Sequence, residues 1–207
     1  MKFLPAVIGA LTLSVGIAYA QEANNSSDPA KLVENVAQTI LKELDANRAA
    51  YRADPSKIDP LVEKDLLPHF DTEYAARLVL GAHWRDATPE QRQRFISAFY
   101  HALIANYGNS IVNFTGDRLK VFPGKLGSDP DRATVRTEVK RDDGSTVPVN
   151  YSMRRTPEGW KAWDVVIDGI SYVKSFHDDY GEEIDQKGLD EVISRMEKGG
   201  KPIVKKS

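Results

Sequence analysis

The sequence contains no cysteine among its 207 residues and only four histidines. The lack of cysteine excludes disulfides, thiolate metal ligands and a lipid anchor on an N-terminal cysteine. The histidines, His69, His83, His101 and His177, do not have HExxH spacing, so no metal site is expected. Stability must come from a hydrophobic core, and a chain of this length can bury one.

The sequence also lacks the common motifs of catalysis and nucleotide binding. It has no GxSxG elbow, no Walker loop and no GxGxxG. Its 28 basic and 30 acidic residues give a formal net charge of −2, which argues against nucleic acid as a partner. The residues alone therefore give no familiar motif on which a reaction could be based.

The first twenty residues have the pattern of a secretory signal peptide. Lys2 is followed by an apolar stretch over residues 3–17 and by the A-x-A site Ala18-Tyr19-Ala20, which predicts cleavage after Ala20. A membrane anchor is the alternative, but the apolar stretch is short and lacks stop-transfer charges. A cleaved leader on a cysteine-free chain favours the bacterial periplasm as the location.

Composition divides the rest of the chain into three parts. Residues 21–27 are polar and are predicted to be a disordered linker, and residues 28–197 are predicted to form a single domain. Residues 198–207 form a basic tail that we expect to be flexible and solvated, with contact to anionic head groups or a partner as the alternative.

Helix-start signals recur in the first half of the domain. Asp-Pro pairs at residues 28–29 and 54–55, Asp71, and the capping box of residues 88–91 each predict the beginning of a helix.

The pattern then changes to strands. Alternating residues over 133–140 and 147–153, the turn Asp142-Asp143-Gly144, and apolar stretches near 119–122 and 160–167 predict antiparallel strands. Helical spacing returns near 172–180 and 189–196. This order predicts an α+β fold, with helices packed against a curved, mainly antiparallel sheet of about four or more strands.

The segment FISAFYHALIANY, residues 95–107, is apolar over most of a helix circumference. Only Ser97, His101 and Asn106 interrupt it, and Ser97 and His101 share one narrow sector with Glu90 and Arg94. Such a helix is either core between two layers or the wall of a cavity for an apolar ligand.

Two groups of polar residues admit a functional interpretation. Asp164 is an acid within an apolar strand and could serve as a general base, although a structural ion pair is the preferred interpretation. Arg85, Arg92 and Arg94 surround the capping turn and could hold a phosphate, but a solvated helix surface is preferred.

Two blocks of sequence resemble the MlaC family, also called the toluene-tolerance auxiliary family. The first is FDTEYAARLVLGAHWRDATPEQRQRFISAFYHALIANY, and the second begins at YSMRRTPEGWKAWDVVIDGIS. The matching positions are Phe70, Asp71, Leu80, Gly81, Trp84, Pro89, Gln91, Phe95, Phe99, Leu103 and Tyr107, then Tyr151, Trp160, Asp164, Gly169, Ser171 and Gly188. The likeness covers most of the chain beyond the leader.

The resemblance implies a periplasmic phospholipid carrier that is not an enzyme. It implies no catalytic residue and no cofactor other than the bound cargo. It implies an apolar cavity between sheet and helices, and a role in outer-membrane lipid asymmetry. The implied partners are phospholipid, the lipid-binding subunit of an inner-membrane ABC transporter, and an outer-membrane lipoprotein–porin complex.

The faces of the expected elements then suggest which residues line that cavity. We predict lining residues on the long helix, on the sheet and at one closed end, with a bulge near Trp163 able to exchange the two sides of its strand. They are Phe95, Phe99, Leu103 and Tyr107; Val149, Tyr151, Val165 and Ile167; and Tyr172, Val173 and Phe176. Two rival functions are an enzyme on a cone-shaped α+β scaffold with Asp164 as base, and a periplasmic chaperone or adaptor.

Overall fold

The computed structural model describes residues 28–112, 115, 118–140 and 143–199, without the side chains of residues 55, 105–111 and 126. The expected leader at 1–20, the linker at 21–27 and most of the basic tail lie outside the described residues. The first half of the domain is helical. Its elements are α1 (Pro29–Ala53), η1 (Pro55–Ile58), α2 (Asp59–Leu61), η2 (Val62–Leu66), η3 (Leu67–His69), α3 (Thr72–Leu80), α4 (His83–Asp86) and α5 (Pro89–Val112).

The predicted helix starts are confirmed by side-chain caps. Asp28 accepts a hydrogen bond from the Ala30 N–H at 2.8 Å, and Asp71 accepts one from the Tyr74 N–H at 3.1 Å. Each bond satisfies an amide that has no partner within the first turn.

The capping box at the start of α5 is reciprocal. The Gln91 N–H donates to Thr88 Oγ1 at 3.1 Å, and the Thr88 N–H donates to Gln91 Oε1 at 2.9 Å. The Gln91 amide nitrogen also donates to Asp190 at 2.9 Å, so the cap joins α5 to α7.

The described strands form one antiparallel sheet. Its order is β1-β3-β4-β5-β6, and the short β2 pairs with β3. In the centre of the sheet Val135 lies opposite Tyr151, which lies opposite Val165. The strands are β1 (Leu119–Val121), β2 (Lys125–Leu126), β3 (Arg132–Lys140), β4 (Thr146–Thr156), β5 (Gly159–Ile167) and β6 (Ile170–Ser171).

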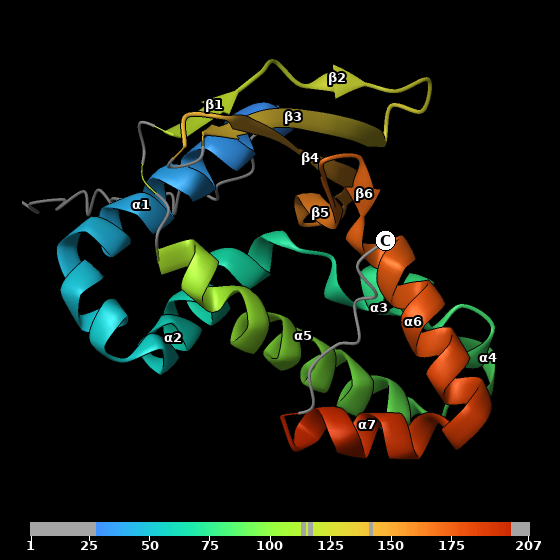
Figure 1. Ribbon diagram of the computed structural model, residues 1–207. Helices are drawn as coiled ribbons and strands as arrows, with labels where there is room; N and C mark the ends of the chain where they lie inside the picture. The colour runs from blue at the N-terminus through green and yellow to red at the C-terminus, as the bar shows by residue number, and fades with distance from the viewer. Residues whose placement is uncertain (1–27, 113–114, 116–117, 141–142, 200–207) are drawn as a thin grey trace, which may run out of the picture.

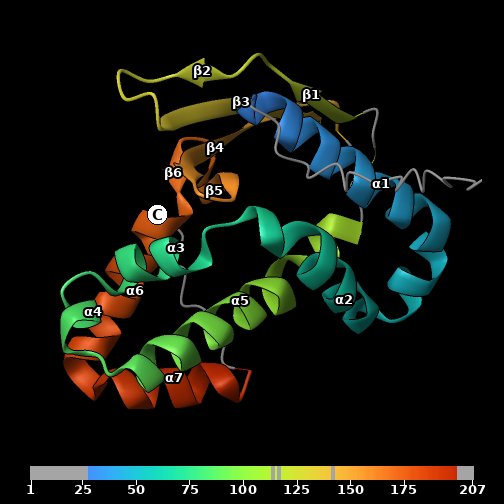
Figure 2. The same ribbon diagram turned by 180° about the vertical axis from the view of Figure 1, so that it is seen from behind.

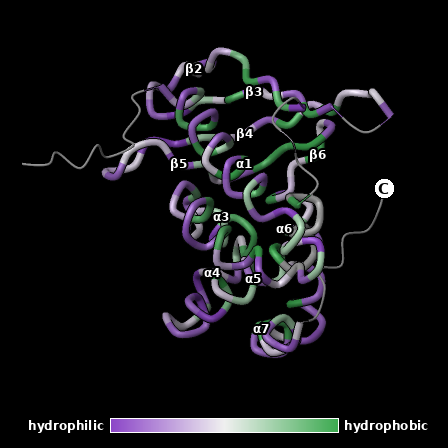
Figure 3. Tube along the Cα trace, turned by 90° about the vertical axis from the view of Figure 1, so that its left-hand side faces the viewer, coloured by the Kyte–Doolittle hydropathy of each residue, from purple (hydrophilic) through white to green (hydrophobic). Residues whose placement is uncertain are grey.

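Two helices follow the sheet, α6 (Tyr172–Lys187) and α7 (Leu189–Glu197). Figures 1 and 2 show the sheet as one layer, with the helices packed on one side of it. Figure 3, a side view, shows hydrophobic stretches in both layers. The predicted α+β fold is confirmed. Among the described residues, no helix is both long enough and apolar enough to span a bilayer.

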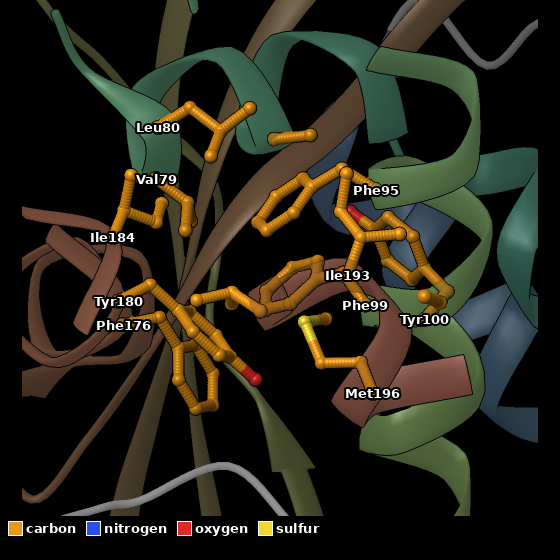
Figure 4. Packing of buried hydrophobic residues seen from close by; sticks show 13 residues of the cluster. Val79, Leu80, Phe95, Phe99, Tyr100, Phe176, Tyr180, Ile184, Ile193 and Met196 are labelled. Atoms are coloured by element: carbon orange, nitrogen blue, oxygen red, sulfur yellow. The ribbon is translucent and has the colours of Figure 1, made fainter. Parts of the chain in front are cut away.

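The largest part of the core lies at the end of the helical layer away from the sheet. Four rings meet there, and their edges contact neighbouring faces: Phe99 and Phe176 have centroids 5.2 Å apart, and Phe95 and Tyr180 are 5.9 Å apart. Ile193 and Met196 of α7 pack beside these rings (Figure 4). We call this cluster, contributed by α3, α5, α6 and α7, the aromatic core.

Gly81 ends α3 in a conformation that favours glycine. Its φ is +54°, and a Cβ atom there would lie 2.5 Å from Cε1 of His177. The His177 ring is itself fixed by a 3.1 Å hydrogen bond between Nδ1 and the Val79 carbonyl. The Leu-Gly pair of the first sequence block therefore serves the packing of α3 against α6.

Candidate ligand-binding cavity

A cavity of about 620 Å³ lies between the sheet and the helices. Its described walls come from the sheet, from α1, from the turns before α3, and from α5 and α6. Nearly all lining side chains are aliphatic or aromatic, and none is a lysine or an arginine among the residues the structure describes. A wall of this kind suits an apolar ligand, and a cavity of this size falls within the range of known ligand pockets.

The sheet side of the cavity contains all four residues predicted there. Val149 and Tyr151 of β4 and Val165 and Ile167 of β5 line it, together with Met153 and Ala162. Each β4 residue lies opposite a β5 residue in the register, so neighbouring side chains form a continuous apolar surface.

A bulge in β5 explains how this surface continues along the strand. Ser152 pairs with Asp164, whereas Met153 pairs with Ala162, so Trp163 is an extra residue between them. The bulge exchanges the two sides of the strand, and Ala162 before it and Val165 after it both reach the cavity.

The long helix contributes to the cavity only in part. Of the predicted residues on this helix, Phe99 and Leu103 line the cavity, and Tyr100 and Ile104 line it beside them. Phe95, which was predicted to line it, is instead fully buried in the aromatic core, where its ring stacks on Phe99 at 5.7 Å. The reason is that α7 covers this end of α5.

The Tyr107 side chain lies outside the described residues, so its predicted place on the wall stays a prediction.

Tyr172, Val173 and Phe176 of the predicted set line the cavity from α6. Asp164 fixes the position of this helix. Its Oδ2 accepts a hydrogen bond from Ser171 Oγ at 2.7 Å, and its Oδ1 accepts one from the Val173 N–H at 3.0 Å. Asp164 is buried, with 4% exposure, and both carboxylate oxygens are engaged. This arrangement favours an anchoring role over that of a general base.

A large part of the wall was not predicted from the sequence. It consists of the inner side of α1 and the irregular turns from η2 to the start of α3. The residues are Leu32, Val33, Val36, Ala37 and Ile40 of α1, and Val62, Leu66, Leu67, His69 and Phe70 of the turns. The three-to-four spacing on α1 was visible as an amphipathic helix, but spacing does not say what an apolar face contacts.

Burial shifts the pKa of three side chains on the wall toward their neutral forms. Burial lowers the pKa of His69, the nearby Lys161 charge lowers it further, and Asp65 partly opposes this. Burial raises the pKa of Tyr100 and of Tyr151. Neutral side chains at these three positions are consistent with an apolar ligand, because a buried charge would need a partner.

Two of the three arginines near the capping turn, Arg92 and Arg94, take part in helix packing, and Arg85 is exposed. The Arg92 guanidinium lies 5.0 Å from the Trp84 ring centroid, and its Nε donates to the Trp84 carbonyl at 3.0 Å. Arg94 forms two hydrogen bonds with Glu197, at 2.9 and 2.8 Å. These contacts favour a structural role over phosphate binding. In the described part of the chain, no three histidine or acidic side chains gather as a metal site would require.

The fold and the cavity define a class: α+β proteins that enclose an apolar cavity between one curved antiparallel sheet and a layer of helices. The model of the MlaC protein family matches residues 34–198, so the chain belongs to the MlaC family.

Two curated relatives agree with this assignment. Toluene tolerance protein ttg2D of Pseudomonas putida is 29% identical over 163 residues, covering 78% of this chain and 75% of its own length. The intermembrane phospholipid transport system binding protein MlaC of Haemophilus influenzae is 23% identical over 182 residues. The match covers 86% of this chain and 85% of the Haemophilus protein.

A solved structure shows the same fold. It is a phospholipid-binding protein from Ralstonia solanacearum, in complex with a phospholipid. The TM-score is 0.77 at 22% identity, over 84% of this chain and 97% of the other.

Proposed function

We propose that this protein is a periplasmic phospholipid carrier, whose cavity holds the acyl chains. The observation that carries the proposal is the apolar cavity of about 620 Å³ between the sheet, α1, α5 and α6. The Haemophilus relative is a phospholipid transport binding protein, and the Ralstonia protein was solved in complex with a phospholipid, which supports the same ligand. The chain's own contacts to the lipid would come from Phe99, Leu103, Val149, Tyr151, Val165, Ile167, Tyr172, Val173 and Phe176.

The energetics favour a carrier that releases its cargo only when docked. Two acyl chains contain about 30 methylenes, and each gains about 0.8 kcal/mol on burial, or roughly 24 kcal/mol before costs. A lipid held this strongly leaves slowly into water. Release therefore needs a partner that opens the cavity beside a membrane, and no covalent step is required.

The proposed carrier function extends to export of the chain and to its partners at the two membranes. Residues 1–20 would direct export, and residues 28–197 would form the lipid-binding domain. The carrier would exchange lipid between an outer-membrane lipoprotein–porin complex and the lipid-binding subunit of an inner-membrane ABC transporter. Such exchange would maintain the lipid asymmetry of the outer membrane. The Haemophilus relative, described as part of an intermembrane transport system, supports this placement.

The test is to fill the cavity without adding a charge. Ala37 of α1 lines the cavity, whereas Ala46 of the same helix is exposed, so Ala37→Trp and Ala46→Trp form a matched pair. The proteins are purified without detergent, extracted with organic solvent, and the lipids are quantified by mass spectrometry. We expect about one phospholipid per chain in the wild type and in Ala46→Trp, and a severalfold lower content in Ala37→Trp because the indole occupies acyl-chain volume.

Circular dichroism controls for folding of each variant. A folded wild-type protein without phospholipid would contradict the carrier proposal, and so would an Ala37→Trp variant that keeps its full lipid content.

A further inference from the structure

The face of the sheet opposite the cavity is strongly cationic. Helix α3 reaches one end of this face, where Tyr74 contacts Arg132 and Arg154. Along β3, Ala133, Val135 and Thr137 are buried beneath the helical layer. The residues that alternate with them, from Arg132 to Lys140, point to the other side of the sheet. We call this second side the outer face.

The strand register brings positive charges from five strands to the outer face. Lys120 of β1 lies opposite Glu138, and Lys125 of β2 lies opposite Thr134. Arg132 pairs with Arg154 of β4, which in turn pairs with Lys161 of β5. With Arg136 and Lys140, the positive side chains of the outer face are Lys120, Lys125, Arg132, Arg136, Lys140, Arg154 and Lys161.

Few acids balance these charges. Glu138 is the acid that β3 itself contributes to this face, while Arg154 is paired with Asp71 and Lys161 lies 3.8 Å from Glu158. The other positive side chains form no ion pair with a described residue: Lys120, Lys125, Arg132, Arg136 and Lys140. Because the whole chain has a formal net charge of −2, the excess of positive charge is local to this face.

Aromatic rings support the cations near both ends of the face. Lys120 Nζ lies 4.6 Å from the Phe122 ring centroid, and the Arg136 guanidinium lies 5.7 Å from it. At the other end the Arg132 guanidinium lies 5.2 Å from the Tyr74 ring. Arg132 also donates a hydrogen bond to the Tyr74 hydroxyl at 3.0 Å, whereas Lys120, Arg136 and Lys140 are exposed.

We propose that the outer face binds the surface of an anionic phospholipid membrane. Arg132, Arg136 and Lys140 follow one another at four-residue intervals, which is about 13 Å in a strand. This spacing is too wide for one phosphate and suits many separate head groups. A protein partner is less favoured, because interface centres are aromatic and depleted of lysine, whereas clusters of Lys and Arg attract anionic bilayers.

The membrane contact does not depend on what the cavity holds. It would place the sheet side of the protein against the bilayer, and the aromatic core at the far end.

The test compares two triple variants with the same net charge. The outer-face variant is Lys120→Gln, Arg136→Gln and Lys140→Gln, all exposed positions. The control variant is Lys42→Gln, Lys57→Gln and Lys64→Gln, exposed positions in the helical layer. Binding is measured by cosedimentation at low salt with vesicles of phosphatidylcholine alone, and of phosphatidylcholine with phosphatidylglycerol.

We expect the wild type and the control variant to bind only the vesicles with phosphatidylglycerol, and to lose binding as salt screens the charges. The outer-face variant should bind about 100-fold more weakly. Equal losses in both variants would overturn the proposal, since net charge alone would then explain binding. A wild type that does not bind anionic vesicles would also overturn the proposal. An acidic protein surface would then be the better candidate for the partner of the outer face.

The lipid extracted from each variant separates this test from the carrier proposal. The outer-face variant should retain the wild-type lipid content, because its substituted positions do not line the cavity.

Discussion

The two ends of α5 have similar composition but opposite surroundings. Toward its N-terminus, Phe95 is fully buried among aromatic rings. About two turns later, Leu103 and Ile104 face a cavity of about 620 Å³. One apolar helix therefore contributes to the packed core in one stretch and to the cavity wall in the next. The elements that pack against each stretch decide which of the two it becomes.

The contacts between helices follow the same division. Around the aromatic core, side-chain hydrogen bonds join the helices: Gln91 to Asp190, Arg94 to Glu197 and Arg195 to Glu183. On the cavity side, α1 meets α5 through the Arg48 guanidinium, which donates to the Val112 carbonyl. A firmly joined core at one end allows the other end to keep unfilled space, which costs packing energy.

The sharpest way to test this comparison is to shorten one side chain at each end of α5. In lipid-free protein, Phe95→Ala should lower the free energy of unfolding by about 4 kcal/mol, because it opens a new void in a packed core. Leu103→Ala should cost less than about 2 kcal/mol, because Leu103 already borders a void. Urea denaturation followed by circular dichroism measures both values. Equal losses would mean that the cavity end is packed as tightly as the core.

A substitution of Glu183 should lower the stability of the aromatic core without changing a residue that lines the cavity. Glu183 is 6% exposed and accepts hydrogen bonds from Arg195 at 2.9 and 2.7 Å. Burial alone would raise its pKa, but the bonds from Arg195 and Lys187 outweigh burial and lower the pKa. Glu183→Gln should therefore cost about 2 kcal/mol at neutral pH, since Arg195 loses its charged partner.

The exposed Glu191→Gln on α7 is the control for this variant and should change stability by less than about 0.5 kcal/mol. Denaturation gives the stability, and mass spectrometry gives the lipid content, which should not change in Glu183→Gln. A lower lipid content would show that the two ends are coupled.

Much of the fold was predictable because its signals are local. Asp28, Asp71 and the Thr88–Gln91 box each form their cap within one turn, and strand alternation needs only neighbouring residues. The order of the elements then indicated the layers. These features do not depend on distant parts of the chain, so sequence patterns identify them.

The candidate site was only partly predictable because lining a cavity is a tertiary property. The hydrophobic pattern of α5 is the same at Phe95 and Phe99, but only Phe99 reaches the cavity, since α7 covers Phe95. The extra residue Trp163 leaves no mark in the strand pattern, yet it decides which β5 side chains face inward. The wall from α1 was missed because its partner surface is formed by segments far away in the sequence.

The smallest expected effect concerns pH and distinguishes the cavity end from the core end. His69 lines the cavity, and burial together with the Lys161 charge lowers its pKa below the ordinary value of about 6.5. The folded state thus resists protonation more than the unfolded state does. The stability that neutral His69 supports is present above about pH 6.5 and is lost as pH falls through the lowered pKa.

We expect His69→Gln to flatten the dependence of unfolding free energy on pH between about pH 7 and pH 5. The number of protons taken up on unfolding should fall by at most about one. Urea titrations across this range measure the slope, with His101→Gln, an exposed histidine of α5, as control. A slope unchanged in His69→Gln would mean that the cavity wall tolerates a positive charge, and that its neutrality does not select the ligand.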